Sequence, residues 1–243
     1  MSAASDTAAD APGSEEPSSA GAGWTSSSLR PRSWWPEVLT VLLFGLTTSL
    51  LLWPSPLVHM DIAVRDAMET IRLSAPWTQW PVRVVTYTGQ GGPLSLICLG
   101  LGLWAVYKRR TVRPLFMFVC TWIVLLPVQY FKKLLDRVGP HYPERGQPPY
   151  PDADGSVLFV GLDPAQSYPS GHAVNAMVFY GIMILILGPL LSKTWKRVLL
   201  IGPAICVLLS QTYLGWHWFW DYPAGLAVGV LIIRATARVP WGT

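Results

Sequence analysis

Two histidines, one aspartate and a short turn are the parts of this 243-residue chain whose types and spacing suit catalysis. The tripeptide Pro169-Ser170-Gly171 precedes His172 and opens a long apolar segment, so helix N-terminal N–H groups would lie beside an imidazole. His217 precedes Asp221 by four residues, which places both side chains on one face of a helical turn. The pattern predicts an anion site with titratable groups at its mouth.

Phosphoryl transfer is the chemistry that these residues favour. A carboxylate on one ring nitrogen of His217 would fix its tautomer and raise the basicity of the other nitrogen. His217 could then act as a nucleophile that accepts a phosphoryl group, while His172 protonates the leaving oxygen. Lys132 and Arg137, together with backbone N–H groups, would stabilise the charge on the phosphate oxygens.

The segments that must position these residues are membrane helices. Apolar residues make up 51% of the chain and charged residues only 13%, and the apolar residues come in long runs. This composition is typical of a multi-pass membrane protein in a lipid bilayer rather than of a soluble domain. The sequence shows no basic-aromatic patch, so we expect no nucleic-acid partner.

The expected fold is all-α, a bundle of six transmembrane helices. Residues 1–33 are rich in Ala, Ser, Gly and Pro and are predicted to form a disordered tail, followed by a membrane domain over residues 34–240. An amphipathic helix at 59–72 is expected at the membrane interface. The six membrane helices are expected at 38–53, from 84 or 93 to 107, and at 114–131, 173–191, 198–213 and 222–233.

Basic residues indicate which way the bundle faces. They cluster at the loops on one side of the six-helix threading, at Arg30 and Arg32, Lys108 to Arg110 with Arg113, Lys193 to Arg197, and Arg234 and Arg238. The positive-inside rule makes that side cytoplasmic, so both termini are expected in the cytoplasm and the site on the outer face. Four basic residues of the loop at 132–167 fall on the other side, where anion binding would explain them: Lys132, Lys133, Arg137 and Arg145.

Two other patterns suggest packing rather than chemistry. The glycine-rich turn at 88–92 lacks the lysine of a phosphate-binding loop, so we expect close packing or a helix break there. Cys98, Cys120 and Cys206 lie in apolar runs without metal-ligand spacing and are expected to be buried. We expect neither a metal nor a cofactor.

Three motifs make the chain resemble the type 2 phosphatidic acid phosphatase superfamily, which comprises integral-membrane lipid phosphate phosphatases. That family has a Lys, six residues and Arg-Pro; then Pro-Ser-Gly-His; then Ser-Arg, five residues, His, three residues and Asp. The second motif is complete here, the third runs from Ser210 to Asp221, and the first runs from Lys132 to Pro140. The resemblance covers about residues 38–238.

The first and third motifs depart from the family pattern. Gly139 and Gln211 stand where the family has phosphate-binding arginines, and Gln is only a neutral donor. Arg137 lies two residues before the expected arginine and is predicted to replace it. Lys133 and His141 are further candidates.

The resemblance implies hydrolysis of a lipid phosphate or polyprenyl (pyro)phosphate through a phosphohistidine intermediate. Two alternatives stay open: a phosphotransferase using the same intermediate, and a non-catalytic, lipid-binding member of the family. The oligomeric state is left open. The expected catalytic residues are His172, His217 and Asp221, and the expected substrate-binding residues are Lys132, Arg137, Ser170, Gly171 and Gln211.

Overall fold

The structure, a computed structural model, describes residues 30–140, 156–159 and 166–241, and the expected tail lies almost wholly outside this range. Within these residues the secondary structure is helical, with no strand. The all-α prediction is therefore confirmed. The α-helices are α1 (Trp35–Leu50), α2 (Pro56–Ser74), α3 (Gln79–Thr86), α4 (Gly91–Arg109), α5 (Arg113–Leu135), α6 (Gly171–Leu187), α7 (Lys193–Leu214) and α8 (Asp221–Arg238).

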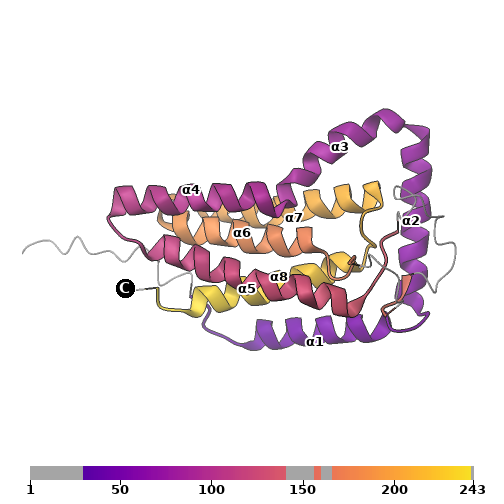
Figure 1. Ribbon diagram of the computed structural model, residues 1–243, viewed down its shortest axis with the longest axis horizontal. Coiled ribbons are helices and arrows are strands. Elements are labelled where there is room, and N and C mark those ends of the chain that lie inside the picture. The colour runs from indigo at the N-terminus through magenta and orange to yellow at the C-terminus, as the bar shows by residue number, and fades with distance from the viewer. Residues whose placement is uncertain (1–29, 141–155, 160–165, 242–243) are drawn as a thin grey trace, which may run out of the picture.

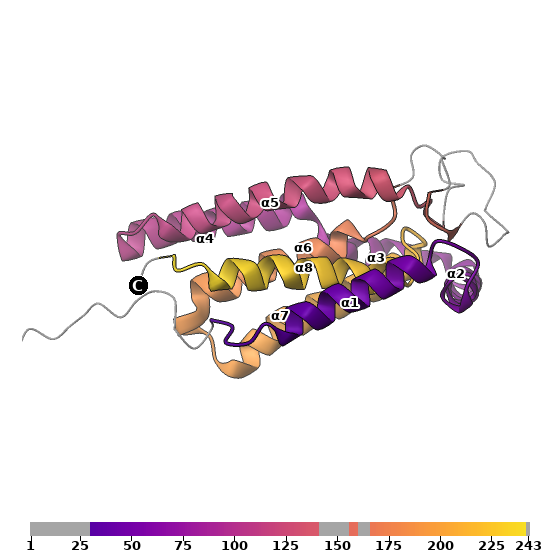
Figure 2. The same cartoon turned by 90° about the horizontal axis from the view of Figure 1, so that it is seen from below.

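The long helices form a bundle that is closed at one end by a crossing helix. Helices α1 and α4 to α8 run along a common axis, as Figure 1 and Figure 2 show. Helix α2 lies across one end of this bundle, and α3 slants from α2 back to α4 (Figure 1). The α4–α5 and α6–α7 connections and the C-terminal end of α8 lie at the opposite end.

Four helical segments in the described part of the chain are long and apolar enough to cross a membrane. Helix α1 is apolar but shorter, with 16 residues. Helix α8 carries Asp221, Arg234 and Arg238 and is not among the four. The four segments are Gly91–Arg109, Arg113–Leu135, Gly171–Leu190 and Lys193–Leu214.

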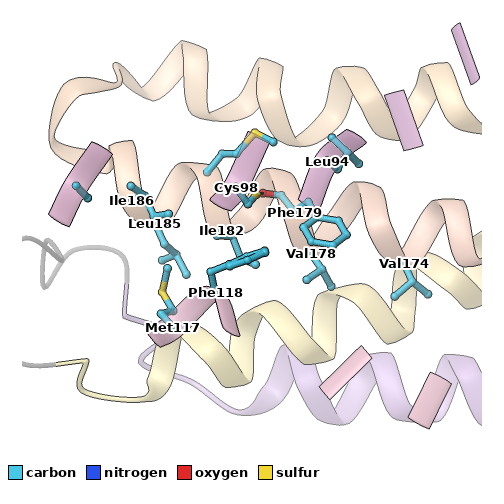
Figure 3. Packing of buried hydrophobic residues seen from close by; sticks show 12 residues of the cluster. Leu94, Cys98, Met117, Phe118, Val174, Val178, Phe179, Ile182, Leu185 and Ile186 are labelled. Atoms are coloured by element: carbon cyan, nitrogen blue, oxygen red, sulfur yellow. Dashed lines mark hydrogen bonds between the residues drawn. The ribbon is translucent and has the colours of Figure 1, made fainter. Parts of the chain in front are cut away.

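Helix α6 is the centre of the bundle. It is apolar on all sides, the pattern of a helix that is surrounded by protein, and it packs against α4, α7 and α8. Because lipid tails are as apolar as these side chains, close van der Waals fit holds such helices together in a bilayer. Figure 3 shows this packing between α6, α4 and α5 around Val174, Val178, Phe179, Ile182, Leu185, Ile186, Leu94, Cys98, Met117 and Phe118.

The glycine-rich turn interrupts the helical structure between α3 and α4, so the membrane helix begins at Gly91 rather than near residue 84. A Cβ atom at Gly89 would lie 2.6 Å from Cγ2 of Val207 and 3.1 Å from the carbonyl oxygen of His172. The expectation of a helix break with close packing is thus confirmed. The absent side chain lets α3 and α4 meet directly against α6 and α7.

Glycines also bring α6 and α8 into close contact. A Cβ at Gly225 would collide with the carbonyl oxygen of Ser170, and one at Gly229 would lie 2.6 Å from Cβ of Met177. Small residues of this kind let two helix backbones approach more closely than larger ones allow. We call the contact at Gly225 and Gly229 the glycine seam. It fixes the start of α6 against the first turns of α8.

Replacing Gly225 with alanine should therefore destabilise the fold, because the new methyl group has to displace the backbone at Ser170. Overpacking of this kind costs about 1–3 kcal/mol. Gly100→Ala is the matched control, since a Cβ at Gly100 meets no atom within 4 Å. Thermal unfolding in detergent should show a lower Tm for Gly225→Ala than for the control; equal values would contradict the packing.

Candidate active site

The first turn of α6 is tied to the first residue of α8. The Ser170 hydroxyl accepts a hydrogen bond from the backbone N–H of Ala173 at 3.4 Å and so caps the helix. The backbone N–H of Ser170 donates to the carbonyl oxygen of Asp221 at 2.8 Å. His172 follows on this capped turn, so its position relative to α8 is set by the backbone.

The turn between α7 and α8 is held just as firmly. Helix α7 ends at Leu214 and is capped by Gly215, whose φ of 68° lies in the left-handed region that favours glycine. Beyond it, the indole N–H of Trp218 donates to the carbonyl oxygen of Val138 at 2.6 Å. The backbone N–H of Trp218 donates to Oδ2 of Asp221 at 2.9 Å. His217 is thus carried on a short turn with little freedom.

The expected pair of His217 and Asp221 is brought together. Nδ1 of His217 lies 3.3 Å from Oδ2 of Asp221, and the Ser167 hydroxyl donates to the same oxygen. Because the carboxylate lies on the Nδ1 side, Nε2 is the ring nitrogen left to meet a substrate. The ring of His172 stands edge-on to that of His217, with 5.9 Å between the ring centroids and 71° between the planes.

Two of the expected phosphate-binding residues, Lys132 and Gly171, lie close to each other, and a third, Gln211, is buried in the last turn of α7. Lys132, near the end of α5, is buried, and its Nζ lies 3.4 Å from the place where a Cβ on Gly171 would be. Gln211, in the last turn of α7, is completely buried, and neither Oε1 nor Nε2 has a hydrogen-bond partner among the described residues. Buried polar groups normally have partners, so this amide is suited to receive one from a ligand.

The packing around Gly139 shows why the family's arginine is difficult to place here. A Cβ at Gly139 would lie 3.2 Å from the carbonyl oxygen of Trp216, so any larger side chain would have to push that backbone aside. Lys133, another candidate, is exposed, and His141 and Arg145 lie outside the described residues.

Arg137 does not lie where we expected it. Its side chain is completely buried, and it donates to Oδ1 of Asp221 and to Oδ2 of Asp61, each at 2.5 Å. Its Nε donates to the carbonyl oxygen of Ser156 at 2.6 Å. The guanidinium of Arg137, which we expected to bind phosphate from its place within the first motif, is thus directed at two carboxylates of the protein.

Burial and charge shift the pKa values of this ion-paired group. Burial raises the pKa of Asp61 to about 6, although the neighbouring guanidinium of Arg137 opposes the rise. Burial also lowers the pKa of Arg137, but the carboxylates of Asp221 and Asp61 outweigh it and leave that pKa above its ordinary value. Arg137 therefore stays charged, whereas Asp61 titrates just below neutral pH.

Sequence reasoning missed Asp61 and Ser167. Asp61 lies in α2, where it accepts a hydrogen bond from the backbone N–H of Trp220 at 2.9 Å in addition to its contact with Arg137. The amphipathic pattern of α2 placed Asp61 among its polar residues and gave no sign that it is buried. Ser167 lies before the Pro-Ser-Gly turn, in a loop without a periodic pattern. No three His, Cys, Asp or Glu side chains within the described ranges are grouped so that they could hold a metal ion.

An apolar groove opens beside the turn that carries His217. It has a volume of about 510 Å³ and lies between α2, α3 and α7. Its lining comes almost wholly from apolar side chains, and it includes Ser210 of the third motif and Phe219, which lies between His217 and Asp221. Other lining residues are Val64, Met68, Val85 and Leu209.

Comparisons with known proteins agree on one family. The family model of the PAP2 superfamily matches residues 97–243. Phosphatidylglycerophosphatase B of Bacillus subtilis (strain 168) is 28% identical over 201 residues, which are 80% of this chain and 90% of that protein. The fold matches the crystal structure of a transmembrane PAP2-type phosphatidylglycerolphosphate phosphatase from Bacillus subtilis with a TM-score of 0.65. That match covers 84% of this chain and 94% of the other at 24% identity.

Proposed function

Because this chain belongs to the PAP2 superfamily, we propose that it is an integral-membrane phosphatase acting on a lipid phosphate or polyprenyl (pyro)phosphate through a phosphohistidine. One observation carries the proposal: the ring of His172 stands edge-on beside that of His217, while Asp221 lies against Nδ1 of His217. This is the arrangement of a nucleophile, the group that orients it, and a proton donor. The reaction so described uses no metal ion and no cofactor.

The first step would transfer the phosphoryl group to the enzyme. Nε2 of His217 attacks phosphorus, and the bond between phosphorus and the lipid oxygen breaks. His172 donates a proton to that oxygen, so the lipid leaves as an alcohol, or as a lipid phosphate when the substrate is a pyrophosphate. Asp221 stabilises the positive charge that develops on the His217 ring.

The second step would release the phosphate. Water attacks the phosphorus of phosphohistidine and gives a proton to His172, which now acts as a base. The bond from phosphorus to Nε2 of His217 breaks, inorganic phosphate leaves, and both histidines return to their starting states.

The phosphate oxygens would be held by one cation and several neutral donors. Lys132 supplies the positive charge beside Gly171. The backbone N–H of Gly171, at the start of α6, would add a donor together with the favourable end of the helix dipole, while the N–H of Ser170 is already bonded to Asp221. Gln211 would contribute its free amide in place of an arginine.

We place this site on the outer face of the cell membrane, with both termini in the cytoplasm. The support is that the α4–α5 turn, the α6–α7 turn and the end of α8, which carry basic residues, lie at the end of the bundle opposite to the start of α6 and the α7–α8 turn (Figure 1). Positive charge of this kind marks the cytoplasmic side. A site on the outer face would suit the recycling of a polyprenyl carrier.

Purified protein in detergent should release inorganic phosphate from at least one lipid of a panel. The panel should hold phosphatidylglycerophosphate, the substrate in the relative's name, with phosphatidic acid and a polyprenyl diphosphate. Addition of glycerol or a sugar should leave the yield of phosphate per lipid consumed unchanged. A phosphotransferase would instead show a falling yield, and a lipid-binding protein would consume none of the substrates.

A further inference from the structure

Both oxygens of the Asp221 carboxylate are held from several directions. Oδ2 receives the backbone N–H of Trp218 and the Ser167 hydroxyl and lies against Nδ1 of His217. Oδ1 receives the guanidinium of Arg137 at 2.5 Å. The orientation of the carboxylate, and with it that of the His217 ring, therefore depends on Arg137 as well as on the local turn.

Arg137 is in turn anchored from three sides. Its guanidinium spans the two carboxylates of Asp221 and Asp61, and its Nε donates to the carbonyl oxygen of Ser156. Its own carbonyl oxygen accepts the backbone N–H of Ser167 at 2.8 Å. A planar fork suits this bridging role, which a single ammonium group cannot reproduce.

Asp61 ties the crossing helix α2 to this group. One of its oxygens contacts Arg137, and the other accepts the backbone N–H of Trp220, the residue directly before Asp221. Asp61 is only 1% exposed and Arg137 0%, so neither side chain meets solvent. Helix α2 thereby holds both the side chain and the backbone that position Asp221.

The charges of the three residues also favour the chemistry at His217. Arg137 alone would neutralise Asp221, and a neutral pair would stabilise a positive imidazole ring poorly. The second carboxylate, that of Asp61, leaves the group of three with one net negative charge. Nearby negative charge favours the protonated or phosphorylated, positively charged form of a histidine.

We propose that Asp61 and Arg137 are positioning residues for the phosphoryl-transfer reaction, acting on His217 through Asp221 without touching the substrate. The inference rests on the proposed function. It also assigns Arg137 a place behind the reacting histidine, in contrast to the phosphate ligand expected from the first motif.

The test is a comparison of kcat and KM for Asp61→Asn and wild-type protein with the best lipid phosphate of the panel. Loss of the residue that orients a metal-bound ligand costs about 10- to 100-fold, and we expect kcat to fall here by a similar factor with KM unchanged. Asp66→Asn is the matched control, because Asp66 lies on the same helix with a side chain that is 59% exposed. Its kcat should equal that of wild type.

The pH dependence separates this role from a purely structural one. The charged groups that act on Asp61 are Arg137 and Asp221. Asp221 acts in turn on His217, beside which His172 lies, and Lys132 acts on His172. Because the pKa of Asp61 is raised to about 6, its side chain becomes neutral in wild-type protein below that pH. The side chain of the Asp61→Asn variant is neutral at every pH. The ratio of their kcat values should fall toward one below that pH.

Arg137→Lys supplies a second variant that keeps the buried positive charge. It should lower kcat with KM unchanged, whereas loss of a direct phosphate ligand would raise KM. A raised KM, or a wild-type kcat in either Asp61→Asn or Arg137→Lys, would overturn the inference while leaving the proposed function intact. If wild-type protein released no phosphate from any lipid, the proposed function would fail and the inference with it.

Discussion

Phosphate release from a lipid phosphate is expected to fall by a factor on the order of 10⁴ or more when His217 is replaced by alanine. The loss would be this large because His217 is the proposed nucleophile, and no other described histidine lies beside Asp221 to take its place. Initial rates of phosphate release by purified protein in detergent micelles measure the effect. His59→Ala is the matched control, since His59 is an exposed histidine on α2.

The covalent intermediate gives the same prediction a second readout. After a brief reaction with a substrate labelled in its phosphate, wild-type protein quenched in alkali should carry the label, because a phosphorus–nitrogen bond to histidine survives alkali and is cleaved by acid. His217→Ala should carry none. Label on the alanine variant, or activity within tenfold of wild type, would refute the assignment of the nucleophile.

Replacing His172 with alanine should produce a loss that depends on the leaving group. A lipid alcohol is a poor leaving group without a proton, so its release should slow by about 10²–10⁴-fold when the general acid is removed. An aryl phosphate such as p-nitrophenyl phosphate leaves as a stable phenolate, so the first step with this substrate should slow far less. Stopped-flow measurement of the first turnover would compare the two substrates.

The second step should then limit the reaction of the His172 variant. With no base to accept the proton from water, phosphohistidine should accumulate from the aryl substrate to a higher level than in wild-type protein. His172→Gln, which keeps a polar side chain but does not exchange protons, should behave like His172→Ala. Equal losses with lipid and aryl substrates would argue for a role in packing or binding instead of proton transfer.

The membrane helices could be predicted from apolar runs, but their ends could not. The helix predicted at 198–213 spans Lys193–Leu214 in the structure, as α7. It is longer because charged residues at the ends of a membrane helix extend their side chains toward the interface without breaking the helix. Helix α5 likewise continues past residue 131 to Leu135 and so includes Lys132. Runs of apolar residues mark the part of a helix that meets lipid, which is shorter than the helix itself.

The core of the candidate site was predictable because its spacing is local. His217 and Asp221 are four positions apart on one short turn, and the structure brings these two side chains together. Asp61 was not predictable, since it is separated from Asp221 by 160 residues and lies on a helix whose polar residues suggested an exposed face. The structure turns part of that polar face inward onto the end of the bundle, where Arg137 compensates its charge.

The glycine seam has a consequence for where the sequence of this protein can vary. Because Gly225 lies against the backbone at Ser170, the half of the site on α6 and α8 behaves as a single rigid block that tolerates little variation. The apolar groove between α2, α3 and α7 has no such constraint, and its walls are side chains that can be exchanged for larger or smaller ones. Substitutions are therefore expected to be tolerated in the groove and not at the seam.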